Sequence, residues 1–93
     1  MMKYYPCIFE RRKKSIGFNV RIPDFDAETD GTNLANAMEK AQDKIIIEIL
    51  IRKDEGMFIA SPSYGEDVAK ECKEGQFVVL IGVNPDKHTH IGG

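Results

Sequence analysis

The chain has 93 residues and a mass of 10.5 kDa, enough for one domain with a single modest hydrophobic core. Apolar residues make up 42% of the sequence and charged residues 30%, which excludes a disordered polar chain and a fibrous repeat. The net charge of −2 argues against a dedicated nucleic-acid-binding domain, where a basic excess is usual. One globular domain is therefore expected over residues 1–84, with a flexible tail over 85–93.

The sequence shows no recognisable secretory signal or membrane span, and its cysteines are isolated; both features favour a cytoplasmic protein. The densest apolar stretch, Ile45–Ile51, contains Glu48 and is far shorter than the roughly 20 residues that cross a bilayer. At the N-terminus the aromatic residues precede the basic cluster, which reverses the order of a secretory signal. Cys7 and Cys72 are isolated, so reduced thiols are expected rather than a disulfide or a thiolate metal site.

Three strands are predicted in the first third of the chain. Residues 3–10 are aromatic and β-branched, and Pro6 is tolerable there at a bulge or where its missing N–H faces no partner. Apolar residues then alternate with polar residues or glycine over 16–22, the period of a half-buried strand. The short hydrophilic connection between these two segments predicts an antiparallel hairpin. A short third strand is expected over Ala27–Asp30, between turns at Pro23 and Gly31.

A long helix is predicted next. Asn33 is a suitable N-cap, and the apolar residues that follow recur at helical spacing, at Leu34, Met38, Ala41, Ile45 and Ile49. Gly56 is suited to the left-handed cap position, so the helix should end over 54–56. This helix is expected to be the dominant element of the domain.

The last elements are a short helix and a strand. Residues 66–73 predict a short helix or frayed turn, and residues 77–83 are apolar throughout, as in a strand covered on both faces at the centre of a sheet. The order of elements predicts an α+β fold of two layers, with the long helix on one face of the sheet. Because the last strand follows a helical crossover, it could pair in parallel with an earlier strand.

An acidic segment lies between the second predicted strand and the helix. Four carboxylates recur at every second position, so in an extended chain they would share one face: Asp24, Asp26, Glu28 and Asp30. A calcium loop starting at Asp26 would need its closing glutamate at position 37, which is alanine, so no metal site is expected. A solvated loop and a docking surface for a basic partner both remain open.

A basic run forms the predicted hairpin tip. Its members are Arg11, Arg12, Lys13 and Lys14. These residues could contact nucleic acid, or they could simply keep an exposed turn soluble. No aromatic residues are interleaved with them as stacking platforms, which weakens the first interpretation.

The second half of the helix is apolar around more than half of its circumference, more than one sheet face can bury. Either the segment over 57–75 folds over the excess, or an apolar stripe mediates self-association. That stripe consists of Ile46, Ile47, Leu50 and Ile51.

No constellation of catalytic residues is evident. Ser61 and Ser63 lie in a turn without a nucleophile-elbow pattern, and Cys72 lacks an identifiable base. His88 and His90 near the C-terminus are interpreted as solvated residues rather than metal ligands. We therefore expect neither enzymatic activity nor a cofactor.

The chain resembles the HicB-like antitoxin family over about residues 2–84. The segments that carry the resemblance are KYYPCIFERRKKSIGFNVRIPDF, GTNLANAMEKAQ and ASPS. They contain an opening aromatic strand, a glycine-aromatic start to the second strand, a Pro-Asp corner, a capped helix with small residues and a Pro-Ser turn. The residues concerned after the opening strand are Gly17, Phe18, Pro23, Asp24, Asn33, Leu34, Ala37, Ala41, Pro62 and Ser63.

The resemblance implies a truncated RNase H-like fold, with a three-stranded meander, a helix and a further strand beside the first. It implies a non-catalytic domain that masks HicA, a small basic mRNA-cleaving toxin. A homodimer or tetramer is expected on separate grounds, from the apolar stripe of the helix. Many relatives carry a C-terminal DNA-binding domain, which is not visible in this sequence. Nuclease activity is not expected, because residues 3–9 and 77–83 contain no carboxylates for two-metal chemistry. The residues expected to bind the toxin are Asp24, Phe25, Asp26, Glu28 and Asp30.

Overall fold

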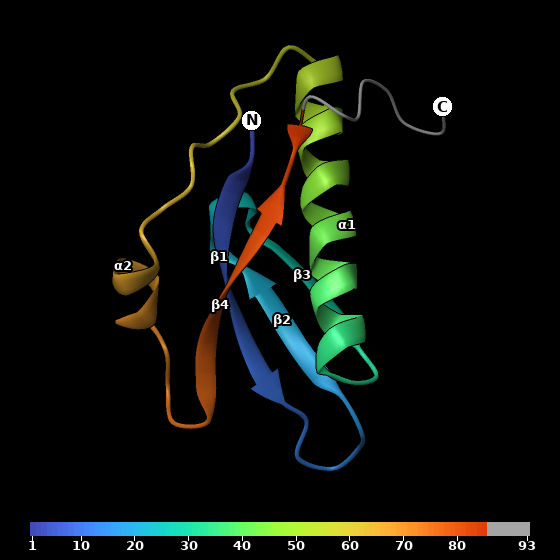
Figure 1. Ribbon diagram of the computed structural model, residues 1–93, viewed down its shortest axis with the longest axis vertical. Helices are drawn as coiled ribbons and strands as arrows, with labels where there is room; N and C mark the ends of the chain where they lie inside the picture. The colour runs from blue at the N-terminus through green and yellow to red at the C-terminus, as the bar shows by residue number, and fades with distance from the viewer. Residues whose placement is uncertain (86–93) are drawn as a thin grey trace.

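The computed structural model describes residues 1–85, which form a four-stranded sheet with a long helix against one face (Figure 1). The expected α+β fold is confirmed. The strands are β1 (Lys3–Arg11), β2 (Phe18–Ile22), β3 (Ala27–Gly31) and β4 (Gln76–Val83). A 3-10 turn, η1 (Pro23–Phe25), precedes β3, and the helices are α1 (Leu34–Asp54) and α2 (Gly65–Ala69).

The strand order in the sheet is β3-β2-β1-β4, and every neighbouring pair is antiparallel. The meander and the return of the last strand beside the first are as expected, but parallel pairing and a central position for that strand are wrong. After α1 ends, the chain runs back along the molecule to α2, so β4 starts from the opposite end and runs in the direction of α1 (Figure 1). β4 is consequently an edge strand.

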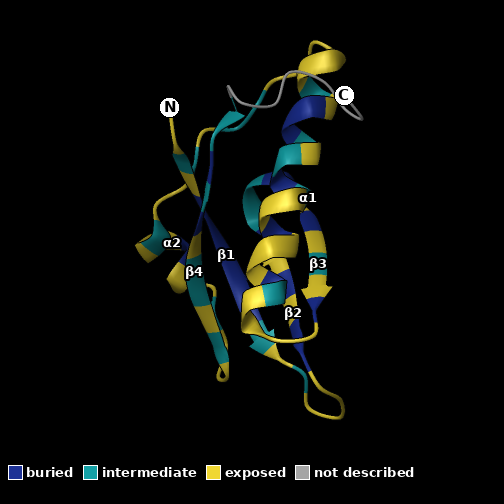
Figure 2. Ribbon diagram, turned by 45° about the vertical axis from the view of Figure 1, so that its right-hand side comes forward, coloured by how far each residue is buried: buried dark blue, intermediate teal, exposed yellow. Residues whose placement is uncertain are grey.

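The main core lies between the sheet and α1. Tyr5, Cys7 and Phe9 of β1 point toward the helix and are fully buried. On α1 the buried residues Ala37, Ala41, Ile45 and Ile49 recur every fourth position, so they form one stripe facing the sheet, while the far side of the helix is mostly exposed (Figure 2). The hydrophobic period of the sequence thus determines the helix orientation.

Small residues allow close approach where α1 begins. A Cβ built on Gly31, the last residue of β3, would lie 2.4 Å from the backbone of Ala37. The turn between them is held by the Asn33 cap, whose side-chain oxygen accepts a hydrogen bond of 2.8 Å from the Asn36 amide. The predicted N-cap is confirmed, and it places the first turn of α1 directly over the end of β3.

The opposite face of the sheet is covered only in part. Pro6 and Ile8 alternate with the inward residues of β1 and are also buried. α2 packs against β1 and β4 on this side, where it buries Val68. Within the segment over 57–75, α2 therefore covers the sheet face opposite α1, whereas Ile59 packs against the core beneath α1. The short helix spans Gly65–Ala69 and is shorter than predicted.

Candidate partner-binding face

The uncovered part of the sheet face opposite α1 is polar, and we call it the outer face. Strand pairing places side chains from all four strands in one row, in the order Gln76, Glu10, Asn19 and Asp30. The next row contains Val78, Ile8, Arg21 and Glu28. All residues of these two rows except Val78 line an open groove of about 520 Å³. The groove is large enough for several side chains of a partner.

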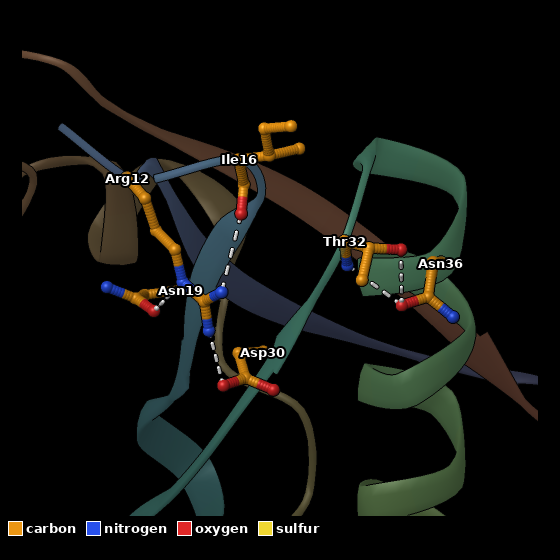
Figure 3. A network of polar contacts seen from close by, with 6 residues as sticks. All are labelled: Arg12, Ile16, Asn19, Asp30, Thr32 and Asn36. Atoms are coloured by element: carbon orange, nitrogen blue, oxygen red, sulfur yellow. Dashed lines mark hydrogen bonds and ion pairs between the residues drawn. The ribbon is translucent and has the colours of Figure 1, made fainter. Parts of the chain in front are cut away.

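Arg12 organises one end of this face (Figure 3). Its Nε donates a hydrogen bond of 3.1 Å to Oδ1 of Asn19, and its Nη1 donates one of 3.4 Å to the Ile16 carbonyl. Its Nη2 forms an ion pair with the Asp30 carboxylate. Arg12 therefore fixes the β1–β2 hairpin against β3 and neutralises part of the acidic face.

The other charged residues of the groove make fewer contacts within the domain than Arg12 does. Gln76 Nε2 donates a hydrogen bond of 3.3 Å to Glu10, and Arg21 lies 3.5 Å from a carboxylate oxygen of Glu71. Within residues 1–85, Glu28 has no ion-pair partner. The groove is lined by the carboxylates of Glu10, Glu28 and Asp30 and by the guanidinium of Arg21. Arg12 pairs with Asp30 at its end, so the carboxylates still outnumber the guanidinium groups and the groove is acidic.

The predicted row of four acids is not formed, because η1 interrupts the extended chain. Asp24 accepts hydrogen bonds from the backbone amide of Ser63, at 2.9 Å, and from the Ser63 hydroxyl. Asp26 follows with φ of 49°, a left-handed conformation that breaks the alternation. Only Glu28 and Asp30 continue into β3 and reach the outer face.

Phe25 belongs to the core rather than to an exposed surface. The centroid of its ring lies 4.9 Å from that of Tyr5 and 5.1 Å from the guanidinium carbon of Arg52. Its side chain is buried. In this conformation Phe25 can position the acidic segment, but it cannot present its ring to a partner.

Two ionisable core residues are electrostatically coupled to Asp24. Burial raises the pKa of the Cys7 thiol to about 12, and the negative charge of Asp24 adds to this effect. The pKa of Tyr5 is raised by the same two causes in the same order, and its hydroxyl donates a hydrogen bond of 2.9 Å to the Ala60 carbonyl. Both groups are therefore uncharged at neutral pH and serve as packing residues.

The basic hairpin residues do not form one surface. The Arg11 guanidinium lies 5.1 Å from the centroid of the Phe18 ring, and Arg12 is engaged with Asp30. Lys13 and Lys14 are exposed. Half of the run is thus occupied by contacts within the domain.

The predicted self-association stripe is also divided. Ile46 packs against the core and Leu50 is buried, whereas Ile47 and Ile51 are 43% and 38% exposed. The structure therefore leaves two of the four side chains available on the far side of α1.

The described residues were also compared with the requirements of a metal site and of a membrane-spanning helix. Among residues 1–85, no three His, Cys, Asp or Glu side chains are grouped so that they could hold a metal ion. His88 and His90 lie outside the described residues. Within the same residues, neither helix combines the length and the apolar character that a membrane crossing requires.

Several outer-face residues were not identified from the sequence, namely Glu10, Asn19, Arg21 and Gln76. The alternation over 16–22 contains the relevant signal, because the polar positions of a half-buried strand must share the face opposite the core. The row across four strands depends on register, which the sequence pattern does not provide.

No protein-family profile matches the chain, and no curated protein matches it in sequence. Among solved structures, it is similar to a chain of a toxin–antitoxin complex from Streptococcus pneumoniae, with a TM-score of 0.77 and 16% sequence identity. The match covers 99% of this chain and 76% of that chain. The likeness shows that the two chains share a fold.

Proposed function

We propose that this chain is a HicB-like antitoxin domain, which binds and masks a small basic mRNA-cleaving toxin of the HicA type in the cytoplasm. The observation that carries the proposal is the shared fold with a chain of a toxin–antitoxin complex over 99% of the present chain. The segments that resemble HicB-like antitoxins support the same assignment independently of that comparison.

The outer face is the surface that best suits such a partner. It is a wide groove whose carboxylates outnumber its guanidinium groups, and Glu28 has no ion-pair partner within residues 1–85. A basic protein approaching this face would be attracted over a long range, and its side chains could pair with Glu28 and exchange with Arg12 at Asp30.

The domain is proposed to act without catalysis. Two-metal hydrolysis needs several carboxylates that converge on one point. On the outer face, Glu10 and Asp30 are separated in their row by a strand and interact with Gln76 and Arg12, respectively. These contacts suit a surface that covers a partner.

Co-expression tests the proposed function directly. The chain is produced together with the small basic protein encoded beside its gene, and growth is compared with that of cells producing the neighbour alone. Relief of growth arrest is expected, together with co-purification of the two proteins. A toxic neighbour that arrests growth equally in the presence and absence of the chain would contradict the proposal.

Charge-neutral variants then test the outer face. In the purified pair, Glu10→Gln combined with Glu28→Gln removes two carboxylates that line the groove, and should weaken binding roughly tenfold at low salt and less at high salt, because salt screens exposed charges. The matched control is Asp43→Asn with Asp54→Asn, which removes the same charge from exposed positions on α1. Equal affinities of both double variants, measured by calorimetry, would remove the outer face from the proposal.

A further inference from the structure

The two edges of the sheet differ in length and charge. β3 has five residues and carries Glu28 and Asp30, whereas β4 has eight residues and no charged side chain or proline. Charged residues, prolines and short strands are the usual protection of an edge against pairing with another chain. β3 has this protection and β4 lacks it, so β4 is the edge that favours a pairing partner.

The direction of the β4 backbone groups follows from a side-chain contact. Gln42 of α1 donates a hydrogen bond of 2.8 Å from Nε2 to the Gly82 carbonyl, so this carbonyl points away from β1. Successive residues of a strand point their backbone groups to alternate sides. The N–H and C=O groups of Val78 and Leu80 therefore also point away from β1, toward the open edge.

Pro6 provides an independent check on this assignment. It lies opposite Leu80 in the β1–β4 ladder, and proline has no N–H to donate. Because Leu80 directs its backbone groups outward, this pair is one that does not require hydrogen bonds. On its other side Pro6 has no ladder partner, because the β1–β2 ladder covers only Ile8–Arg11.

The open part of the edge is limited at both ends. Gly82 is capped by Gln42, and the Gln76 amide donates a hydrogen bond of 3.0 Å to the Lys73 carbonyl. Between these caps, the backbone groups of Val78 and Leu80 have no hydrogen-bond partner within residues 1–85. The unpaired segment is therefore short and centred on Val79.

Apolar side chains border this segment on both faces of the sheet. Leu80 is 53% exposed on the face that carries α2, and Phe77 is 40% exposed on the face that carries α1. Met38 of α1 and Tyr64, which precedes α2, are exposed as well, and Met38 lines a small hollow together with Leu80. An added strand would thus bury apolar surface above and below the sheet.

We propose that β4 binds the β4 strand of a second copy of this chain, antiparallel and about a two-fold axis through Val79. In this register Val78 of each copy lies opposite Leu80 of the other, and each such pair exchanges two main-chain hydrogen bonds. The pairing uses the open backbone groups and leaves both end caps intact. It joins two four-stranded sheets into one continuous sheet.

The charge of the edge indicates a second copy rather than a basic toxin. β4 is uncharged, so self-pairing brings no like charges together, while the carboxylates that attract a basic protein lie on the outer face. A two-fold axis at a strand pair is perpendicular to the sheet, so both outer faces point to the same side and stay open. This inference does not require the proposed function, because it concerns the chain by itself.

Sedimentation equilibrium of the isolated full chain tests the dimer at concentrations between roughly 10 and 200 µM. The wild type should sediment as a dimer. Leu80→Lys should raise the dissociation constant at least roughly tenfold, because it places a charge at both symmetric positions where the pairing would bury a leucine. The control Ile47→Lys with Ile51→Lys, on the exposed side of α1, should leave the dimer unchanged. A monomeric wild type, or a dimer that is lost only in the α1 variant, would overturn the proposal.

Amide hydrogen exchange of the wild type provides a test that needs no variant. In a monomer, the amides of Val78 and Leu80 face solvent and exchange rapidly, whereas those of Val79 and Ile81 face β1. In the proposed dimer all four amides are protected, and protection of Val78 and Leu80 falls on dilution. Rapid exchange of Val78 and Leu80 at the highest concentration would rule out the pairing, even if Leu80→Lys fails to fold.

Discussion

The two faces of the sheet differ in what covers them. One face lies under α1 across the strands and buries aromatic and β-branched residues such as Phe9, Val20 and Ile22. On the other face, the five-residue helix α2 covers only the part near β1 and β4. Beyond α2, the row of side chains from Gln76 to Asp30 is open to solvent. Stability is thus concentrated on one face, which leaves the other free to change its charges and contacts at little cost in folding free energy.

This difference also explains why the acidic groove remains open. A helix as long as α1 on the outer face would cover Arg21 and Glu28. α2 has five residues, and it lies over β1 and β4, where Ile8 is buried and Leu80 stays half-exposed. In addition, Asp24 holds Ser63 and so fixes the segment that leads into α2. The acidic segment therefore helps to position the partial cover, and its last two acids line the groove that the cover leaves open.

The largest expected contrast between the faces is in thiol reactivity. At pH 8 a pKa of about 12 leaves roughly one Cys7 thiol in 10⁴ ionised, and the side chain is fully buried under α1. Cys72, just after α2, is partly exposed. In the native protein, a disulfide reagent should modify Cys72 at least roughly 10³-fold faster than Cys7, whose modification requires unfolding.

Absorbance of the released thiolate measures this contrast. One thiol per chain should react in the fast phase, and the variant Cys72→Ser should lack that phase. Two fast thiols in the folded wild type would show that the α1 face opens far more easily than its burial suggests.

The next effect in size concerns the centre of the core. Phe9→Ala removes a fully buried ring that lies 5.9 Å from the ring of Phe77, and a cavity would remain between sheet and helix. The free energy of unfolding should fall by about 3–5 kcal/mol, measured by urea denaturation monitored by circular dichroism. Since small domains have marginal stability, partial unfolding in the absence of denaturant is expected. A loss under about 1 kcal/mol would contradict the assignment of this face as the stabilising one.

The smallest of the three effects concerns α2, the short helix that covers part of the sheet face opposite α1. Val68→Ala removes the buried side chain of α2, and the expected loss in the free energy of unfolding is about 1.5–3 kcal/mol. If α2 is a local cover, amides of α2 should lose hydrogen-exchange protection in this variant while those of β1 keep theirs. Equal loss of protection in both elements would indicate that the two faces unfold as one unit.

The local elements were predictable because short-range physics determines them. The alternation over 16–22 identifies β2, the spacing of Ala41, Ile45 and Ile49 identifies the buried stripe of α1, and Asn33 marks where that helix begins. The hairpin of the first two strands also follows from the short connection between them, and the sheet confirms it. The return of the last strand beside the first, which the family resemblance implied, is likewise confirmed.

Predictions failed where a residue's environment depends on distant parts of the chain. The apolar run over 77–83 suggested a central strand, but β4 lies at an edge of the sheet. The position and direction of a strand depend on where the preceding chain packs, and local composition does not determine that. The spacing of the acids from Asp24 to Asp30 suggested one extended face, but Phe25 is drawn into the core and η1 turns the chain there.

The sequence by itself determined which residues become strands and helices and which side of each is apolar, because backbone propensity and hydrophobic period act over a few residues. Only the tertiary structure decided which polar residues form the groove and which edge stays open. Glu10, Asn19 and Asp30 come from three strands, and register brings them into one row. The unpaired backbone groups of Val78 and Leu80 likewise result from the position of β4 beside β1 and from the reach of Gln42.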